Sequence, residues 1–247
     1  MNETISRMMQ HRSIRKYSDR PVGKELVEQI VSAGQMASSS SHVQAYSVIA
    51  VTDAARKAKL AELCGNQAYV AECPVFLVWC ADLSRLKRAA ERHLPSQSTY
   101  EGTTENFIVA TIDAALAAQN AAVAAESLGL GIVYIGGIRN QSEQVASLLE
   151  LPRLAYPVFG MCLGYPGQEP GLRPRLPLPA VLHWNGYDAA GQDKQVAAYD
   201  EVMSKYLHER TGGAKDTPWS ELMAEKLAQP ARLHMRGFLA KRGFELK

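Results

Sequence analysis

Five side chains that are cationic, or become so on protonation, lie within the eleven residues from His11 to Pro21, HRSIRKYSDRP. They are His11, Arg12, Arg15, Lys16 and Arg20, with Ser13 among them and Asp19 as the one acid. Guanidinium and imidazolium groups donate charge-assisted hydrogen bonds to phosphates and carboxylates, often in pairs. The pattern indicates a binding site for an anion, which belongs either to the protein itself or to a ligand.

Two further short motifs offer anion-binding groups. Prolines flank Arg175 in RPRLP, residues 173–177, so Arg173 and Arg175 are held on a stiff backbone and lose little entropy when they bind a phosphate. The run SSSS, Ser38 to Ser41, supplies hydroxyl and N–H donors. A solvated loop remains the alternative for both motifs, because serine and proline runs are common in loops.

The glycine-rich stretch LGLGIVYIGG does not match either familiar nucleotide fingerprint. Tyr134 stands where G-x-G-x-x-G needs its third glycine, and Gly137 stands where a Walker A loop needs lysine. What remains is a strand that ends in Gly136 and Gly137, whose bare backbone can approach a flat ligand. A plain turn is the alternative interpretation.

Composition narrows the class of protein. The chain has 247 residues, of which 47% are hydrophobic and 21% charged, and its net charge is +2. A nucleic-acid binder usually has a wider basic face, so we expect none to be bound. The N-terminus shows no signal-peptide pattern and no run approaches the ~18 apolar residues of a membrane span, which predicts a cytoplasmic protein without membrane contact. The four cysteines form no C-x-x-C pair and are expected to be buried and reduced, and no histidine has metal-ligand spacing.

Apolar periodicity predicts alternating helices and strands. The segment KELVEQIVSAGQMA reads as an amphipathic helix, and AYSVIAVTD as a strand, after which Asp53 caps a helix over 54–64. PVFLVWCAD, GIVYIGG and YPVFGMCLGYP read as further strands. Together these elements predict one α+β domain over residues 1–247.

Three helical features complete the expected fold. The helix over 103–128 is rich in alanine and apolar on nearly all sides, so it must be buried in the centre of the fold or against a second subunit. Asn140 and Glu143 resemble a capping box for the helix SEQVASLLEL. The tail from Lys194 onward is mostly helical and more polar.

Taken in order, these motifs resemble the FMN-dependent nitroreductase family, in particular its oxygen-insensitive NADPH nitroreductase and NADPH–flavin oxidoreductase branch. The resemblance spans roughly residues 5 to 190. It implies an α+β homodimer with a central mixed sheet flanked by helices, an FMN at the subunit interface, and a C-terminal helical excursion, about 191–247, around the partner.

The resemblance also implies roles for individual residues. His11, Arg12, Ser13, Arg173 and Arg175 are placed at the FMN phosphate and ribityl chain, Arg15 beside the flavin N1/O2 region, and Gln67 at the pyrimidine edge. Tyr134, Ile135, Gly136 and Gly137 pass under the ring, and Ser39, Ser40 and Ser41 come from the other subunit. Arg15 then tunes the flavin, which is the reactive group, and no catalytic acid or base and no metal is expected.

The implied reaction is ping-pong hydride transfer through non-covalent FMN, from NADPH, with NADH possible, to a nitroaromatic, a quinone or free flavin. His42 departs from the residues often found at this place in the family and faces the substrate. Arg210 and Lys215 are the candidate ligands of the NADPH 2′-phosphate. A dedicated flavin or quinone reductase, or a non-catalytic FMN-binding module, remain alternatives.

Overall fold

The computed structural model describes all 247 residues, which form two units. The first comprises Met1–Pro170 together with Arg232–Lys247, and the second comprises Gly171–Ala231. Each unit is described separately below.

The first unit is built on a four-stranded antiparallel sheet with the order β1-β2-β4-β3. The strands are β1 (Tyr46–Val51), β2 (Val75–Asp82), β3 (Gly131–Ile135) and β4 (Ala155–Gly164). The one parallel pairing is an isolated bridge between Ser13 and Ile132, made by the N-terminal segment along the free edge of β3. The expected α+β fold is confirmed, and its parallel component is confined to this short edge segment.

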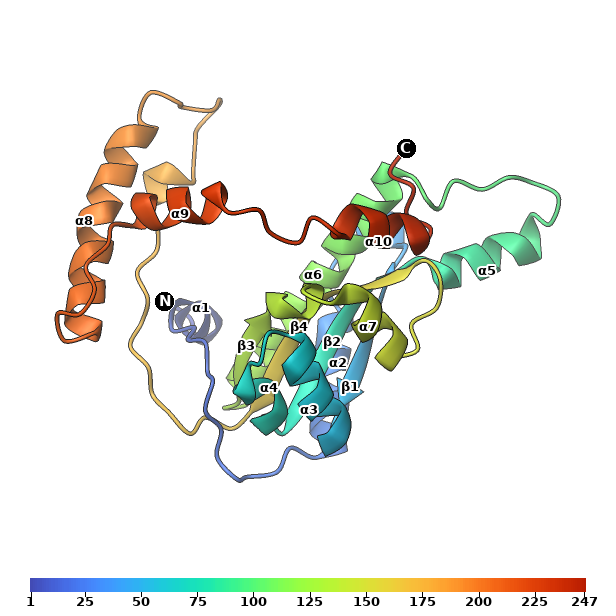
Figure 1. The fold of residues 1–247 in the computed structure, drawn as a ribbon, viewed down its shortest axis with the longest axis horizontal. Helices are drawn as coiled ribbons and strands as arrows, with labels where there is room; N and C mark the ends of the chain where they lie inside the picture. The colour runs from blue at the N-terminus through green and yellow to red at the C-terminus, as the bar shows by residue number, and fades with distance from the viewer. The chain divides into compact units, whose positions relative to one another are not determined.

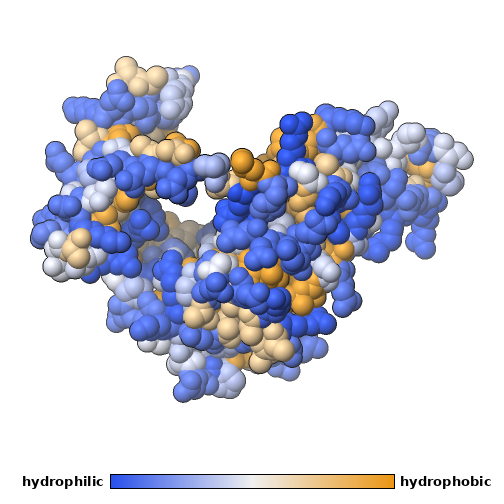
Figure 2. Space-filling view, viewed as in Figure 1, coloured by the Kyte–Doolittle hydropathy of each residue, from blue (hydrophilic) through white to orange (hydrophobic).

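The sheet lies between two helical layers (Figure 1), and the side chains of its strands pack alternately against one and the other. On β2, Val75, Leu77 and Trp79 pack with α2 (Lys24–Gln35) and α6 (Thr104–Ser127). The intervening residues Phe76, Val78 and Cys80 pack with the helices of the other layer, α3 (Ala54–Leu63), α4 (Ala68–Glu72) and α7 (Ser142–Leu148). Because successive strand residues point to opposite faces, a strand that is buried on both faces must be apolar throughout, as VFLVWCA is. Hydrophilic residues dominate the outer surface in the same view (Figure 2).

Helix α6 is the central helix of one layer, and its small residues explain its close packing. A Cβ added at Gly34 of α2 would lie 2.9 Å from the carbonyl oxygen of Ala117, so the two helices approach to backbone contact. The buried face of α6 carries mainly alanine, the residue that fills such a contact at no cost in side-chain entropy.

The opposite face of α6 is apolar and exposed. Ile108, Ile112 and Leu116, spaced four residues apart, are 43%, 49% and 43% exposed. By length and composition alone α6 would also pass as a membrane span, contrary to the expectation that no segment does so. The same composition suits a core helix, and within this chain α6 serves as one, through its alanine face.

The C-terminal segment returns to the first unit. Helix α10 (Met235–Lys241) buries Phe238 and Leu239, and the ring of Phe244, which is fully buried, makes edge contacts with Phe107 and Tyr156. The remaining helices of this unit are α1 (Glu3–Met9), α5 (Ser84–His93) and the 3-10 turns η1 (Ser40–His42) and η2 (Gly136–Arg139).

Local capping was predicted with mixed success. Asp53 caps α3 as expected and accepts from the N–H of Arg56 at 2.7 Å. The capping box at Asn140 and Glu143 was wrong: residue 141 is the N-cap of α7 and makes no side-chain capping bond. Asn140 Oδ1 instead accepts from Arg232 and Glu143 from Lys241, because the returning C-terminal segment supplies these donors. All four cysteines are buried and free, as predicted.

The second unit consists of an extended segment, a 3-10 turn η3 (Leu178–Ala180), α8 (Gln192–Arg210) and α9 (Trp219–Ala228). The helical tail predicted from Lys194 onward is therefore present. The Asp200 carboxylate of α8 accepts from the N–H and hydroxyl of Ser220 at 2.8 and 2.5 Å, and the rings of Tyr199 and Trp219 meet edge to face. These contacts join the two helices.

Candidate functional site

The basic N-terminal segment is laid along the edge of β3. Ile14 N donates to Ile132 O at 2.9 Å, and Gly167 N donates to Lys16 O at 2.9 Å, so the segment lies between β3 and the residues that follow β4. Gly131 makes this close approach possible, because a Cβ there would lie less than 3.0 Å from the side chain of Ile14. The candidate residues His11 to Arg15 are thereby fixed beside the sheet.

Two of the basic side chains already have partners within the chain. His11 Nδ1 lies 2.5 Å from Glu126 Oε1, and Arg12 Nη1 donates to Glu169 Oε1 at 3.1 Å. Arg12 also has an unsatisfied hydrogen-bond donor, because its Nε is buried without a hydrogen-bond partner. A buried N–H without an acceptor costs free energy that a bound anion would recover.

A cavity of about 480 Å³ lies beside Arg12 in the first unit. Its lining includes a second guanidinium, Arg7, together with Glu126, Gly131 and Gln168. The side chain of Gln168 also accepts from the backbone N–H of Arg15 at 3.3 Å. The segment after β4 thus helps to shape the wall of this cavity and to place Arg15.

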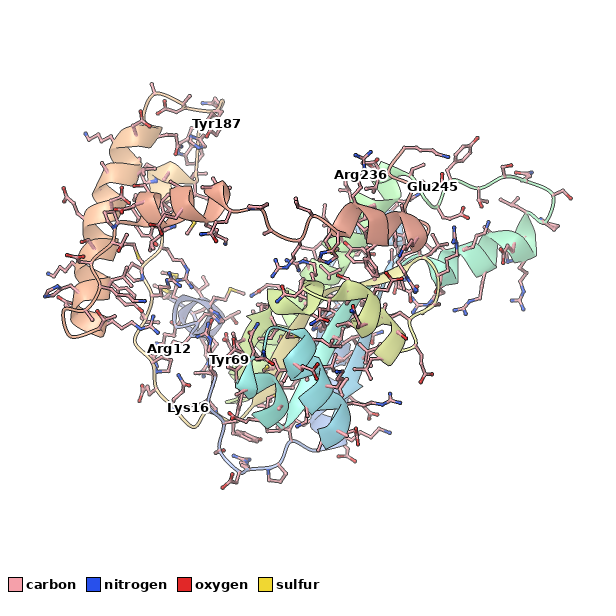
Figure 3. The ribbon with its side chains drawn as sticks, in the orientation of Figure 1. Arg12, Lys16, Tyr69, Tyr187, Arg236 and Glu245 are labelled. Atoms are coloured by element: carbon pink, nitrogen blue, oxygen red, sulfur yellow. The ribbon has the colours of Figure 1, made fainter.

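A second group of polar side chains stands at the start of α4. Gln67 Nε2 donates to Cys64 O at 2.7 Å, and the hydroxyl of Tyr69 donates to Gln67 Oε1. The guanidinium of Arg15 lies 5.9 Å from the centre of the Tyr69 ring, and Tyr69 appears with Arg12 and Lys16 in Figure 3. Because an amide offers two N–H donors and two carbonyl lone pairs, Gln67 retains one of each for a ligand.

The end of β3 completes this arrangement. A Cβ on Gly137 would lie less than 3.0 Å from both Cys64 O and Gln67 Nε2, so this backbone packs directly on the Gln67 turn. At Gly136 the nearest atom to an added Cβ would be a terminal nitrogen of Arg139, at 3.5 Å. Three segments that are distant in sequence therefore lie along β3. Arg12 is beside its start, and the Gln67 turn packs on Gly137 beyond its end. Arg15, near the Tyr69 ring, lies between them.

Tyr134 is the one ionisable side chain of the glycine turn. Its hydroxyl donates to Gln119 Oε1 at 3.3 Å, and its ring meets Phe159 edge to face. Burial, with a smaller contribution from Glu126, raises the pKa of the Tyr134 phenol above its ordinary value. The phenol therefore remains protonated at neutral pH and acts as a hydrogen-bond donor.

The predicted serine run is held elsewhere. Ser40 N donates to Asp113 Oδ1 at 3.0 Å, and none of the hydrogen bonds of Ser39, Ser40 or Ser41 joins them to the group at the end of β3. His42 is exposed, and its Nε2 lies 3.2 Å from the side-chain amide nitrogen of Gln44.

Four predicted cations lie in the second unit. Arg173 and Arg175 are exposed, and Arg175 Nη1 donates to Arg173 O at 2.8 Å. The guanidinium of Arg210 lies 5.9 Å from the centre of the Tyr206 ring, at the end of α8. Lys215 follows in a hydrogen-bonded turn, where its N–H donates to Thr211 Oγ1 at 2.9 Å.

Family models match almost the whole chain. The Nitroreductase family model matches residues 8–165, and the Nitroreductase family, C-terminal domain, model matches residues 173–247. The chain belongs to the nitroreductase family. Relatives in this family support the assignment over the full length. The chain is 42% identical over 246 residues to the FMN reductase (NADPH) of Bacillus subtilis. It is 40% identical over 245 residues to the oxygen-insensitive NADPH nitroreductase of Salmonella typhimurium. Each comparison covers 99% of this chain and 99% of the relative.

A solved structure agrees with these relatives. The hypothetical oxidoreductase YcnD from Bacillus subtilis superimposes with a TM-score of 0.97 at 40% identity, covering all of both chains. The fold and the C-terminal helices are therefore those of this family.

Sequence reasoning missed three residues of the arrangement. Tyr69 orients Gln67, Glu126 pairs with His11, and Asp113 anchors the serine run. Asp113 and Glu126 gave a signal that was available, because a lone acid within an apolar helix must find donors when the helix is buried. Tyr69 gave none beyond its position two residues after Gln67.

Proposed function

We propose that this protein is an FMN-dependent NAD(P)H oxidoreductase with nitroreductase and flavin reductase activity. NADPH is the preferred electron donor, and nitroaromatics, quinones or free flavin are the acceptors. Bound FMN supplies the hydride chemistry, and the chain supplies position and charge. The relatives named as an FMN reductase and an NADPH nitroreductase support this class of reaction.

The observation that carries the proposal is that three segments distant in sequence lie together along β3, with Arg12 beside its start and the Gln67 turn and Gly137 at its end. Their groups match the parts of a flavin mononucleotide: cations for a phosphate, an amide for a pyrimidine edge, and bare glycine backbone for a flat ring. The buried, unanswered Nε of Arg12 supports the fit, because it needs an acceptor that the chain does not provide.

At the phosphate end, the proposed ligands are His11, Arg12 and Ser13, completed by Arg173 and Arg175. Glu126 fixes the ring of His11 by bonding Nδ1, which leaves Nε2 for the ligand. Each charge-assisted contact contributes about 1.5–3 kcal/mol, so several hold FMN tightly without a covalent bond.

At the ring, Gln67 offers its free N–H and lone pair to the pyrimidine edge. The backbone from Tyr134 through Ile135 and Gly136 to Gly137 lies under the ring. Arg15, oriented by its backbone bond to Gln168 and its position over Tyr69, places a positive charge beside N1 and O2.

We further propose a cytoplasmic homodimer with each FMN at the subunit interface. The exposed apolar row Ile108, Ile112 and Leu116 supports this, because burying it against a second copy removes it from water. Ser39, Ser40 and Ser41 then serve the FMN of the partner subunit, with His42 at the substrate opening.

Purified protein and rapid reduction kinetics test the proposal. We expect a yellow dimer whose flavin absorbance is bleached by NADPH, and more slowly by NADH at low concentration. Light scattering that finds a flavin-loaded monomer would contradict the interface site. Flavin colour without bleaching by either nucleotide would instead favour the non-catalytic FMN-binding module.

Arg15→Ala is expected to retain part of the FMN but to lower its reduction potential and slow hydride acceptance. Removing the cation disfavours the negative charge that the cofactor gains on reduction. Potentiometry of the loaded variant measures this, with Lys16→Ala as a control that removes a neighbouring exposed cation. A midpoint potential equal to that of the wild type would refute the role of Arg15.

The double variant Arg210→Ala with Lys215→Ala is expected to erase the preference for NADPH over NADH. Two exposed contacts to the 2′-phosphate contribute a net ~1–3 kcal/mol, which is a preference of roughly tens-fold, expressed mainly in KM. NADH kinetics should change little. As a control, Lys194→Ala with Lys226→Ala removes equal charge from the same unit. An undiminished preference for NADPH in the Arg210→Ala, Lys215→Ala variant would show that these residues do not bind the 2′-phosphate.

A further inference from the structure

The segment after α2 has an unusual backbone. Ser41, His42 and Gln44 adopt the left-handed region, with φ of 46°, 58° and 51°. Residues with a side chain pay roughly 1–2 kcal/mol each for this conformation, and none of the three is glycine. Such a run persists only where surrounding contacts hold it.

Asp113 supplies the main restraint. It lies in the middle of α6 and is only 1% exposed. Its Oδ1 accepts from Ser40 N and its Oδ2 accepts from Ala45 N, both at 3.0 Å. These two N–H groups bracket the left-handed run, so one buried carboxylate fixes both of its ends.

The other restraints on this segment are weaker or lie at one end. Arg85 Nη1 donates to Gln44 O at 3.3 Å in an exposed position, and Asp82 N donates to Ala45 O at 2.9 Å. Charge-assisted bonds in a buried site are stronger than exposed neutral ones. Asp113 is therefore the contact whose loss should free the segment.

We propose that Asp113 is a positioning residue for flavin binding and substrate access, acting through the segment Ser39–Ala45. This inference rests on the proposed function, in which Ser39–Ser41 serve the partner subunit's FMN and His42 stands at the opening. Asp113 itself touches no ligand. It holds the donors of the segment in a conformation that the chain would otherwise leave.

Asp113→Asn is the sharpest test because it preserves shape while turning one acceptor into a donor that faces a backbone N–H. In apo protein, we expect amide exchange of a peptide covering residues 39–45 to accelerate about tenfold, the size expected for one lost buried bond. In the dimer, FMN should bind about tenfold more weakly, and KM for the acceptor should change more than kcat.

Thr111→Val is the matched control. Thr111 lies on the same helix, and the substitution removes a half-buried bond to the Tyr156 hydroxyl at 2.5 Å, so it destabilises α6 packing without touching the segment. It should leave exchange of residues 39–45 and the FMN affinity at wild-type values. If Asp113→Asn matches Thr111→Val in both measurements, the positioning role is wrong while the proposed function stands. If wild-type protein binds no FMN, the proposed function fails, and unchanged exchange in apo Asp113→Asn would separately show that Asp113 does not hold the segment.

Discussion

Gly137→Ala is expected to weaken FMN binding by about 100-fold, and Gly136→Ala to weaken it less. The added methyl at 137 would meet the backbone oxygen of Cys64 and the amide nitrogen of Gln67 at less than 3.0 Å. Overpacking of this kind costs ~1–3 kcal/mol and is relieved only by moving the backbone. Both candidate ligands of the flavin, the Gln67 amide and the glycine backbone, would then be displaced together.

Gly136→Ala adds the same methyl one residue earlier, where the nearest atom is the end of a flexible arginine at 3.5 Å. Neither glycine has a positive φ, so a difference between the two variants reports space and not backbone strain. Fluorescence titration of the apo proteins with FMN measures the affinities. Equal affinities in the two variants would show that contact between Gly137 and the Gln67 turn does not shape the site.

Much of the first unit was predictable because its strands and helices carry a clear apolar period. The strand VFLVWCAD and the long alanine-rich helix have the lengths and positions expected from sequence. The composition of α6 identified a helix that must be buried, but it did not show which face is buried within the chain and which face is exposed. Only packing separates the buried alanine face from the exposed row Ile108, Ile112 and Leu116.

The candidate site was predicted through family resemblance more than through residue chemistry. The cations of HRSIR indicated an anion site, and Glu126 was an acid that needed a donor, yet nothing in the sequence showed that it would pair with His11, 115 positions away. The capping box at Asn140 failed for the same reason, since Arg232 is 92 residues away. Rules based on neighbouring residues describe only contacts within a few positions of the chain. In both cases the partner came from a distant segment.

Phe244→Ala is expected to be the most damaging change to stability. The ring is fully buried and meets both Phe107 and Tyr156 edge to face, with ring centres 5.9 and 5.3 Å apart. Truncating a buried phenylalanine costs ~3–5 kcal/mol through lost transfer free energy and the cavity that remains. For a chain of this length the midpoint of thermal unfolding should fall by roughly 6–20 °C.

The effect should also spread to the C-terminal segment as a unit. Glu245 N and Leu246 N both donate to Gly102 O, and Leu154 N donates to Arg242 O, so this segment is tied to the N-terminal end of α6 and the start of β4. Loss of the Phe244 ring leaves those backbone bonds and the buried Phe238 and Leu239 to hold the segment, and hydrogen exchange of residues 235–247 should rise before global unfolding. Tyr100→Ala removes an aromatic ring that is 77% exposed and serves as the control. If Phe244→Ala and Tyr100→Ala had the same midpoint of thermal unfolding, the C-terminal segment would add nothing to the stability of the first unit.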